Sequence, residues 1–399
     1  MVNQMLEPLW TVLLAATGLI YFAFLEVVRR GLGKLRDAEA YRDKADEYLD
    51  VSVIIPCRNE AEHIGHALND LIEQNYPADK MQIIVVNDRS TDDTGKEVSD
   101  YLSRMPQLEL VEINLCPDGI SPKQNALVAG MQKATGDIII TTDGDCRFQK
   151  GWVSALVNQF KGETGVVTGL TVFDRGRSEP FWQRMQQLDY LSHSFFAAGA
   201  IGAGMAFNCN GSNLALRREV FDEVGGYGDL KDVSVSDDTA LLQRIKRDTK
   251  WDIAFSTDPQ NRVHSWPEET PAEVFNQRLR WAAGGVSSNP RVLMFELITF
   301  IFFMALFLSP WLWLGGLISG SWVVLFILKL LQELRVMRLG WNIFKIKPDM
   351  ISFLAMELVH IPAILLFSIL GNLWGFRWKG QHYKGIGKKE DAPSMVSER

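Results

Sequence analysis

Two aspartates separated by one glycine, Asp143-Gly144-Asp145, follow the apolar run DIIITT at residues 137–142. Carboxylates at this spacing can face one hard cation while the glycine lets the backbone turn tightly. A Mg²⁺ or Mn²⁺ ion held by one or two carboxylates and completed by phosphate oxygens is usual around nucleotides. Taken alone, the motif is more typical of a surface turn, where aspartate and glycine serve only the geometry. Its surroundings therefore decide between a metal site and a turn.

Polar clusters also end two earlier apolar runs. Residues 51–56 lead into Cys57-Arg58-Asn59-Glu60, and residues 82–87 lead into Asp88-Arg89-Ser90-Thr91-Asp92. Asp88 could accept a hydrogen bond from a nucleobase, and the run 90–92 is also a good helix N-cap. Open α/β sheets bind ligands at the carboxyl ends of their strands. We therefore expect Glu60, Asp88 and the Asp143–Asp145 pair at one edge of a sheet.

The elements that must position these residues alternate between strand and helix. Short β-branched runs predict strands at 51–56, 82–87, 108–113 and 137–142, separated by helices at 60–73, 91–104 and 123–133. Such alternation indicates right-handed βαβ units and an α/β domain with a mainly parallel sheet. A nicotinamide-binding Rossmann domain is poorly supported, because the first strand leads into PCRNEAEH and not into GxGxxG.

An apolar run of 20 residues, Leu9–Val28, precedes this domain and is long enough to cross a membrane once. No basic segment precedes it and no small-residue cleavage site follows, which favours a retained anchor over a signal peptide. Four basic residues come directly after it: Arg29, Arg30, Lys34 and Arg36. By the positive-inside tendency, the domain that follows is cytoplasmic, at the inner membrane of the cell.

Apolar composition returns after the domain. Residues 292–334 could form two spans joined by a tight turn, Met350–Trp374 forms a further apolar segment, and a basic tail follows. Three crossings here would place that tail outside, against the charge rule. Either the tail breaks the rule or one segment lies in the membrane without crossing it, and the strongly basic tail favours the second.

These features divide the chain into an N-terminal anchor at 1–30, a linker at 31–50 and an α/β domain at 51–291. A C-terminal membrane region of two to three segments at 292–376 and a basic cytoplasmic tail at 377–399 complete it. The net charge of −7 argues against a nucleic-acid partner. The four scattered cysteines show no zinc-binding spacing, which is typical of free thiols in a reducing compartment.

An ordered set of motifs covers residues 51 to 281. It comprises VSVIIPxxNE, VVNDxSTDDT, KxxAL from Lys123, DGD, GSNLALRREVF from Gly211, GGY from Gly225, SDDTALL from Ser236 and QRLRW from Gln277. In this order the set resembles the inverting family-2 glycosyltransferases, which have a GT-A fold. The resemblance implies a nucleotide-sugar donor, with UDP as the nucleotide, and a Mg²⁺ or Mn²⁺ cofactor.

The resemblance also implies roles for single residues. Asp238 would be the general base that takes a proton from the acceptor hydroxyl, and Asp237 and Asn213 would lie at the acceptor. Asp145 would bind the metal together with Asp143, and the donor would contact Pro56, Glu60, Asp88, Lys123 and Asp143.

The QRLRW motif places Gln277, Arg280 and Trp281 on one helix face at i, i+3 and i+4. Arg280 could neutralise charge on the leaving diphosphate, and Trp281 offers a flat apolar surface to a sugar or acceptor. These three residues complete the predicted catalytic set with Asp238. The alternative interpretation is a basic and aromatic helix that anchors the domain to lipid.

Two segments favour a membrane lipid as the acceptor. Residues 181–206 are aromatic and rich in small residues, which suits either a lipid-guiding helix at the membrane or an ordinary buried helix. Residues 377–383, RWKGQHY, resemble the W-[RK]-G-x-x-Y tail of ceramide and carotenoid-type lipid glycosyltransferases, where it lies near the active site. We therefore expect transfer of a single sugar to a membrane lipid. The alternatives are a processive polysaccharide synthase and an inactive scaffold that binds nucleotide sugars.

Overall fold

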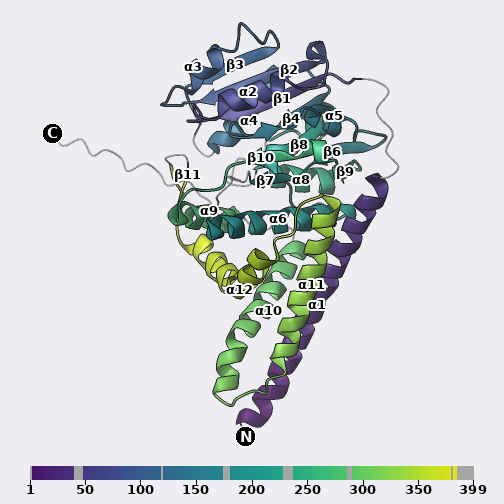
Figure 1. Cartoon of the computed structure of the whole chain (residues 1–399), viewed down its shortest axis with the longest axis vertical. Coiled ribbons are helices and arrows are strands. Elements are labelled where there is room, and N and C mark those ends of the chain that lie inside the picture. The colour runs from purple at the N-terminus through teal and green to yellow at the C-terminus, as the bar shows by residue number, and fades with distance from the viewer. Residues whose placement is uncertain are drawn as a thin grey trace, which may run out of the picture.

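The computed structural model describes residues 2–39, 48–117, 120–173, 180–227, 237–284, 290–378 and 381–383 (Figure 1). Part of the predicted linker, Ser236 and the basic tail beyond Tyr383 lie outside these ranges. Figure 1 shows an α/β domain at one end, a layer of helices beneath it and a bundle of long helices at the other end.

A seven-stranded, mainly parallel sheet forms the centre of the domain, in the order β3-β2-β1-β4-β8-β6-β9. The four predicted strands are confirmed as β1 (Val51–Cys57), β2 (Met81–Asp88), β3 (Leu108–Ile113) and β4 (Ile138–Thr141), which pair in parallel. β8 (Leu214–Arg217) runs antiparallel between β4 and β6 (Thr164–Thr168), and β9 (Asp252–Phe255) is parallel to β6. A small second sheet joins β5 (Arg147–Phe148), β10 (Val263–Ser265) and β7 (Thr171–Phe173).

Alternate residues of β1 serve two separate cores, as the two-residue period of a strand requires. Val53 and Ile55 pack in one core with α2 (Ile64–Ile72), α3 (Thr94–Ser99) and α5 (Trp152–Val157), and Ile54 packs in the other with α4 (Pro122–Lys133). α2 and α3 begin later than predicted, because residues 59–61 and 90–94 hydrogen-bond to each other across the two loops.

Helices α6 (Phe181–Gly202) and α9 (Pro271–Gly284) lie between the sheet and the long helices (Figure 1). The short helix α7 (Arg218–Glu223) follows β8, and α8 (Asp237–Asp248) precedes β9. Single turns of 3₁₀ helix complete the domain at η1 (Ala78–Lys80), η2 (Gly211–Asn213) and η3 (Pro259–Asn261). The layer of α6 and α9 is therefore the part of the domain that faces the long helices.

The bundle contains α1 (Val2–Glu39), α10 (Pro290–Leu314) and α11 (Trp322–Ile343), which run side by side (Figure 1). α12 (Met350–Leu373) lies obliquely to them, beneath α9 and α6. Among the described residues, three stretches are long and apolar enough to cross a membrane: 6–36, 292–314 and 350–373. α11 is more polar than the sequence suggested, because the helix continues past the apolar run at 334 to Ile343. These helices indicate a membrane-associated protein.

Glycines bring α1 and α6 into backbone contact. A Cβ atom at Gly31 would overlap the carbonyl oxygen of Gly199, and one at Gly202 would collide with the carbonyl oxygen of Gly31. Only glycine permits this approach. α1 also continues past residue 30, where the sequence placed the end of the anchor, so that the span and its contact with the domain are one helix.

A hairpin of β11 (Phe376–Trp378) and β12 (Gln381–Tyr383) follows α12 and packs on α9. The Phe376 and Tyr383 rings stack with centroids 5.0 Å apart. The side chain of Asn276 hydrogen-bonds both backbone polar groups of Arg377, at 2.5 and 2.9 Å. The first part of the predicted tail therefore lies against the α/β domain.

Candidate active site

The loops after β1 and β2 are braced against each other. Asn59 and Arg89 adopt left-handed backbone conformations, with φ of 55° and 53°. The backbone amide of Asn59 donates to Ser90 Oγ at 3.0 Å, and the backbone amide of Thr91 donates to the side-chain oxygen Oδ1 of Asn59 at 2.8 Å. The Glu60 amide donates to Thr94 Oγ1 at 2.8 Å. The N-cap residue of α3 is Asp93, one position after the run 90–92 that the sequence suggested, and this loop fixes the backbone of Glu60.

The predicted donor residues of these loops reach one edge of the sheet. Pro56 and Glu60 are half-buried, whereas Asp88 is only 3% exposed. The carboxylate of Asp88 forms an ion pair with Arg89 at 2.8 Å. A ligand that contacts Asp88 would therefore meet a carboxylate already oriented by a guanidinium.

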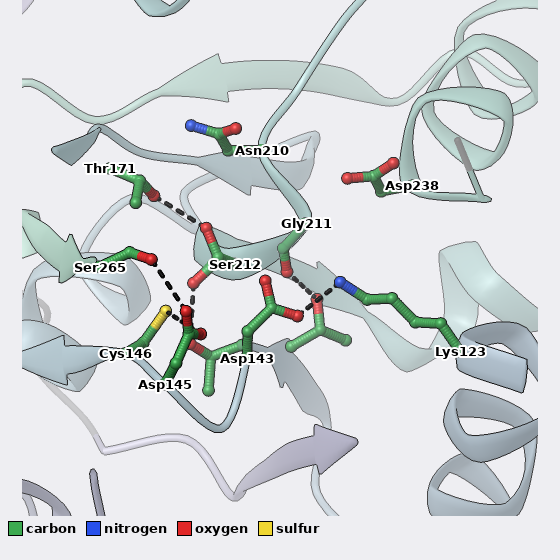
Figure 2. Close-up of polar contacts among 12 residues, drawn as sticks. Lys123, Asp143, Asp145, Cys146, Thr171, Asn210, Gly211, Ser212, Asp238 and Ser265 are labelled. Atoms are coloured by element: carbon green, nitrogen blue, oxygen red, sulfur yellow. Dashed lines mark hydrogen bonds and ion pairs between the residues drawn. The ribbon is translucent and has the colours of Figure 1, made fainter. Parts of the chain in front are cut away.

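The DGD turn follows β4 at the same edge. A Cβ atom at Gly144 would lie 2.6 Å from Cys57 Sγ, so the turn needs glycine to pack against the β1 loop. Asp143 pairs with Lys123 at 2.5 Å, and Asp145 accepts a hydrogen bond from Ser265 Oγ at 3.1 Å (Figure 2). The motif is thus built into the site and is not an isolated surface turn.

Oxygen atoms suited to a divalent cation gather here. One ligand atom each of Asp143, Asp145 and Cys146 lies within 4.8 Å of the others. Burial, together with the negative charges of Asp145 and Asp143, raises the pKa of the Cys146 thiol, which keeps it protonated. Hard cations prefer carboxylate oxygens, so the residues fit Mg²⁺ or Mn²⁺ with the two aspartates as ligands.

Asp238 begins the first turn of α8 and lies against η2. A Cβ atom at Gly211 would collide with its carboxylate, and the Thr239 amide donates to Asp238 Oδ1 at 2.8 Å. Burial raises the pKa of Asp238, while the positive charge of Lys123 opposes that rise. Figure 2 shows Lys123 reaching Asp143, with Asp238 beside Gly211. One ammonium group therefore acts electrostatically on both carboxylates.

The position of Gly211 is set by hydroxyl groups on neighbouring strands. Thr141 Oγ1 donates to the Gly211 carbonyl at 3.1 Å, and Thr142 Oγ1 donates to the Ser212 carbonyl at 2.8 Å. The Thr171 and Ser212 hydroxyls lie 3.0 Å apart (Figure 2). The sheet thus holds the turn against which Asp238 rests.

Asn213 does not fit the acceptor contact that the sequence suggested. Its side chain is fully buried and accepts a hydrogen bond from the Trp152 indole at 3.0 Å. Its amide donates to the carbonyl oxygens of Leu170, at 3.2 Å, and Asn261, at 2.7 Å. These bonds turn Asn213 inward and assign it to holding η2. The backbone of Asp237 starts α8, and its side chain lies outside the described part of the structure.

Helix α9 places Gln277 and Arg280 of the QRLRW motif near acidic residues of the site. Gln277 donates to Glu268 Oε1 at 2.6 Å. Burial lowers the pKa of Arg280, and the negative charges of Glu268, Asp143 and Asp145 oppose that effect. The Arg280 guanidinium is therefore within electrostatic reach of the aspartate pair.

Trp281 faces α6 at the border of the site. Its ring lies 5.7 Å from that of Tyr190, and the Arg278 guanidinium lies 4.2 Å above it. Arg278 also pairs with Asp189 of α6 at 2.6 Å. The ion pair and the ring contacts fix the plane of Trp281.

Sequence reasoning missed Glu268, Asp189 and Ser265. Burial raises the pKa of Glu268, while Arg280 lowers it. Glu268 follows a proline in a loop that belongs to none of the quoted motifs. For Asp189, the available signal was an acid and His193 at i and i+4 within an otherwise aromatic segment.

Comparison with known proteins identifies the domain. Residues 52–225 match the family model described as glycosyl transferase family 2. Residues 52–225 are a glycosyltransferase family 2 domain. The named relatives of this glycosyltransferase support the same enzyme class. The family resemblance read from the ordered motifs is therefore confirmed.

Several curated proteins are similar over most of this glycosyltransferase. It is 24% identical to beta-monoglucosyldiacylglycerol synthase of Synechocystis sp. over 83% of the chain and 70% of that protein. It is 28% identical to probable glycosyltransferase YdaM of Bacillus subtilis, over 62% of the chain and 58% of that protein. Poly-beta-1,6-N-acetyl-D-glucosamine synthase of Staphylococcus aureus is 26% identical, over 67% of the chain and 61% of that protein. The chain thus spans between 58% and 70% of these relatives' lengths.

A solved structure confirms the GT-A fold of the glycosyltransferase. Mannosyltransferase PcManGT from Pyrobaculum calidifontis, in complex with GDP-Man and Mn²⁺, superposes with a TM-score of 0.58. The superposition covers 90% of this chain and 99% of that chain at 19% identity. At this identity the likeness shows the fold alone.

Proposed function

We propose that this glycosyltransferase moves one sugar from a nucleotide-diphosphate donor to a hydroxyl group of a membrane lipid, with inversion at the anomeric carbon. The observation that carries the proposal is the meeting of Asp143, Asp145, Lys123 and Asp238 at one sheet edge. Arg280 of α9 is within electrostatic reach of the aspartate pair, and the α6–α9 layer lies between the sheet and the long apolar helices (Figure 1). The beta-monoglucosyldiacylglycerol synthase relative supports a lipid acceptor.

In this proposal the donor binds along the carboxyl ends of β1, β2 and β4. Pro56, Glu60 and Asp88 contact the nucleoside, which we take to be uridine, and Asp143 lies at the ribose. Asp145, with Asp143, would hold Mg²⁺ or Mn²⁺, and Mn²⁺ in the PcManGT complex supports this assignment. The bound ion would supply positive charge beside the diphosphate. Lys123 and Arg280 add protein charge there.

Asp238 is the proposed general base. Its carboxylate takes the proton from the acceptor hydroxyl while that oxygen attacks the anomeric carbon, and the bond from this carbon to the diphosphate oxygen breaks. Attack on the side opposite the leaving diphosphate inverts the configuration. A buried carboxylate with a raised pKa is a stronger base than an exposed one. Trp281, held by Arg278 and Tyr190, offers its ring to the acceptor.

The placement of the protein in the cell forms part of the proposal. The basic residues after the first span favour a catalytic domain on the cytoplasmic side of the inner membrane. We retain the division into anchor, linker, GT-A domain, C-terminal membrane region and tail, and move the end of the anchor helix to Glu39.

One assay tests the transfer reaction. Membranes that contain the protein are incubated with a panel of radiolabelled nucleotide sugars and then extracted with organic solvent. We expect label in the lipid fraction with one donor, and about 10²- to 10⁴-fold slower labelling with the Asp238→Asn variant. Label that stays out of the lipid fraction with every donor would refute the lipid acceptor.

A processive polysaccharide synthase is the second candidate, because the Staphylococcus aureus relative is named as a synthase of poly-beta-1,6-N-acetyl-D-glucosamine. Mass spectrometry of the product separates the two reactions, since a single transfer adds one sugar mass and a synthase yields a ladder. An inactive scaffold would bind donor and give neither product.

A further inference from the structure

Both ends of α12 are attached to the catalytic domain. At its start, the N-cap residue Asp349 forms a bidentate ion pair with Arg184 of α6, at 2.7 to 2.9 Å. At its end, the β11–β12 hairpin is bonded through Arg377 to Asn276 of α9. Since α6 and α9 belong to one domain on one side of the membrane, both ends of α12 lie on that side.

The middle of α12 is joined to α11 by charged side chains. Glu357 pairs with Lys329 of α11 at 2.7 Å, and Lys329 pairs with Glu333 at 2.8 Å. Glu333 lies seven residues, or about 10 Å of helix, before Gly340, which packs against Phe195 of α6. Counted from the domain end of α11 at Ile343, Glu333 lies ten residues, or about 15 Å, along the helix, so the charged cluster lies near the middle of α11.

The bundle helices differ from α12 in that their two ends lie at opposite ends of the bundle. The turn between α10 and α11 lies at the far end of the bundle, where the Ser319 amide donates to Glu7 of α1 at 3.1 Å. From there α11 returns to the domain, where Phe344 stacks on Phe195. Its 22 residues measure about 33 Å, which matches the hydrocarbon thickness of a bilayer. α1, α10 and α11 each connect the two ends, whereas α12 begins and ends at the same one.

One face of α12 carries a continuous apolar stripe. Its exposed residues recur every three or four positions along the whole helix: Ile351, Leu354, Leu358, Pro362, Leu366, Ile369 and Leu373. Residues on the other side, among them Phe353, Ile361, Leu365 and Gly371, are buried. A Cβ atom at Gly371 would lie 2.6 Å from that of Ala282 in α9. The helix therefore has a protein side and an apolar side.

We propose that α12 does not cross the bilayer but lies in the leaflet nearer the catalytic domain, with its apolar stripe in the lipid. α1, α10 and α11 are the crossing helices. The partner of the stripe is the lipid leaflet, because α12 packs against α10 and the exposed large side chains of both helices are apolar. A helix of 24 residues is long enough to span, but length does not distinguish a span from an amphipathic helix in the interface.

This arrangement places the C-terminal tail on the catalytic side. It resolves the conflict in the sequence, because the basic tail and the basic residues after α1 then share one side of the membrane. This placement of α12 does not depend on which acceptor the domain uses.

Cysteine labelling of the full-length protein in sealed vesicles of known orientation tests the topology. The background is Cys116→Ser, since the other three cysteines are buried. With a membrane-impermeant maleimide, we expect Asp79→Cys, Lys347→Cys and Arg377→Cys to react from one side and Ser319→Cys from the other. Reaction of Arg377→Cys only from the Ser319 side would overturn the proposal.

A depth measurement tests the position of the stripe. Nitroxide labels on single cysteines at Leu354, Leu358, Leu366 and Leu373 report relative accessibility to oxygen and to a water-soluble nickel chelate. We expect all four to lie within the leaflet nearer the domain. Leu297, Phe307 and Trp311 on α10 are the matched controls. Along α10 the ratio of oxygen accessibility to nickel-chelate accessibility should reach its maximum at the middle of the helix, as expected for a helix that crosses the bilayer. The same profile along α12, with the highest ratio of oxygen to nickel-chelate accessibility at the middle of the helix, would overturn the proposal.

Discussion

Replacing Asp238 by asparagine tests the proposed base with little change in shape. Asparagine keeps an oxygen that can accept from the Thr239 amide, now at 2.8 Å, and it fits against Gly211 as aspartate does. What it loses is the ability to take a proton. The fold and the donor site should therefore survive while the chemical step slows.

The expected loss of turnover follows from the role of Asp238 as general base. General-base catalysis contributes about 10²- to 10⁴-fold, so turnover should fall by that factor, or about 3 to 5 kcal/mol in activation free energy. Turnover is measured as label transferred to lipid, and donor affinity by calorimetric titration, which should change less than about threefold. Asp248→Asn, on the exposed last turn of the same helix, is the matched control and should leave turnover unchanged. A loss of turnover below tenfold in Asp238→Asn would refute the assignment.

The raised pKa of Asp238 adds a pH signature. Turnover should rise with pH as the carboxyl ionises, at a pH above the ordinary range for aspartate. The folded state binds this proton more tightly than the unfolded state. The resulting stability is fully present below the unfolded pKa and is lost as pH rises through the folded pKa. Asp238→Asn should therefore unfold at a higher temperature near neutral pH, as scanning calorimetry in detergent would report.

Four further perturbations follow from the described contacts. Gly211→Ala places a Cβ against the Asp238 carboxylate and should lower turnover by about tenfold or more, whereas Gly33→Ala, where the added atom meets open space, should not. Arg278→Gln removes the partner of Asp189 and the cation above Trp281. It should cost about 1 to 3 kcal/mol of folding stability by denaturant titration and lower turnover without weakening donor binding. Lys329→Met removes the ammonium group that pairs with both Glu333 and Glu357 and should cost about 3 to 5 kcal/mol, seen as a lower melting temperature in detergent. Chelation with EDTA should abolish sugar transfer, and Mn²⁺ or Mg²⁺ should restore it in the parent protein but not in Asp145→Ala.

The first half of the sheet could be predicted from the sequence because buried parallel strands are short β-branched runs. β3 matches its predicted range at both ends, β1 differs by one residue at one end, and β2 and β4 differ by one residue at each end. The helix starts were less accurate, because α2 and α3 begin only after loops whose hydrogen bonds connect residues about 30 positions apart. A local pattern carries no information on such a partner.

Some residues of the candidate site could likewise be placed from the sequence, and others could not. Asp143, Asp145 and Lys123 follow strands or begin a helix, so their meeting could be inferred from parallel topology. Asn213 stands next to polar loop residues, but its side chain turns inward to bond Trp152, which only the packing decides. Glu268 enters through a loop that belongs to none of the motifs quoted from the sequence, and its burial beside Arg280 appears only in three dimensions.

The glycine contact between α1 and α6 limits how the enzyme can be rearranged. A membrane tether that only holds a domain near lipid can be exchanged for any apolar helix of equal length. Here the backbone of Gly31 contacts the backbones of Gly199 and Gly202, so α1 is packed against α6 as part of the catalytic domain. A chimera with a generic anchor would supply side chains where none fit and would push α6, which carries Asp189 and Tyr190, away from its place. The anchor and the catalytic domain are therefore constrained to change together.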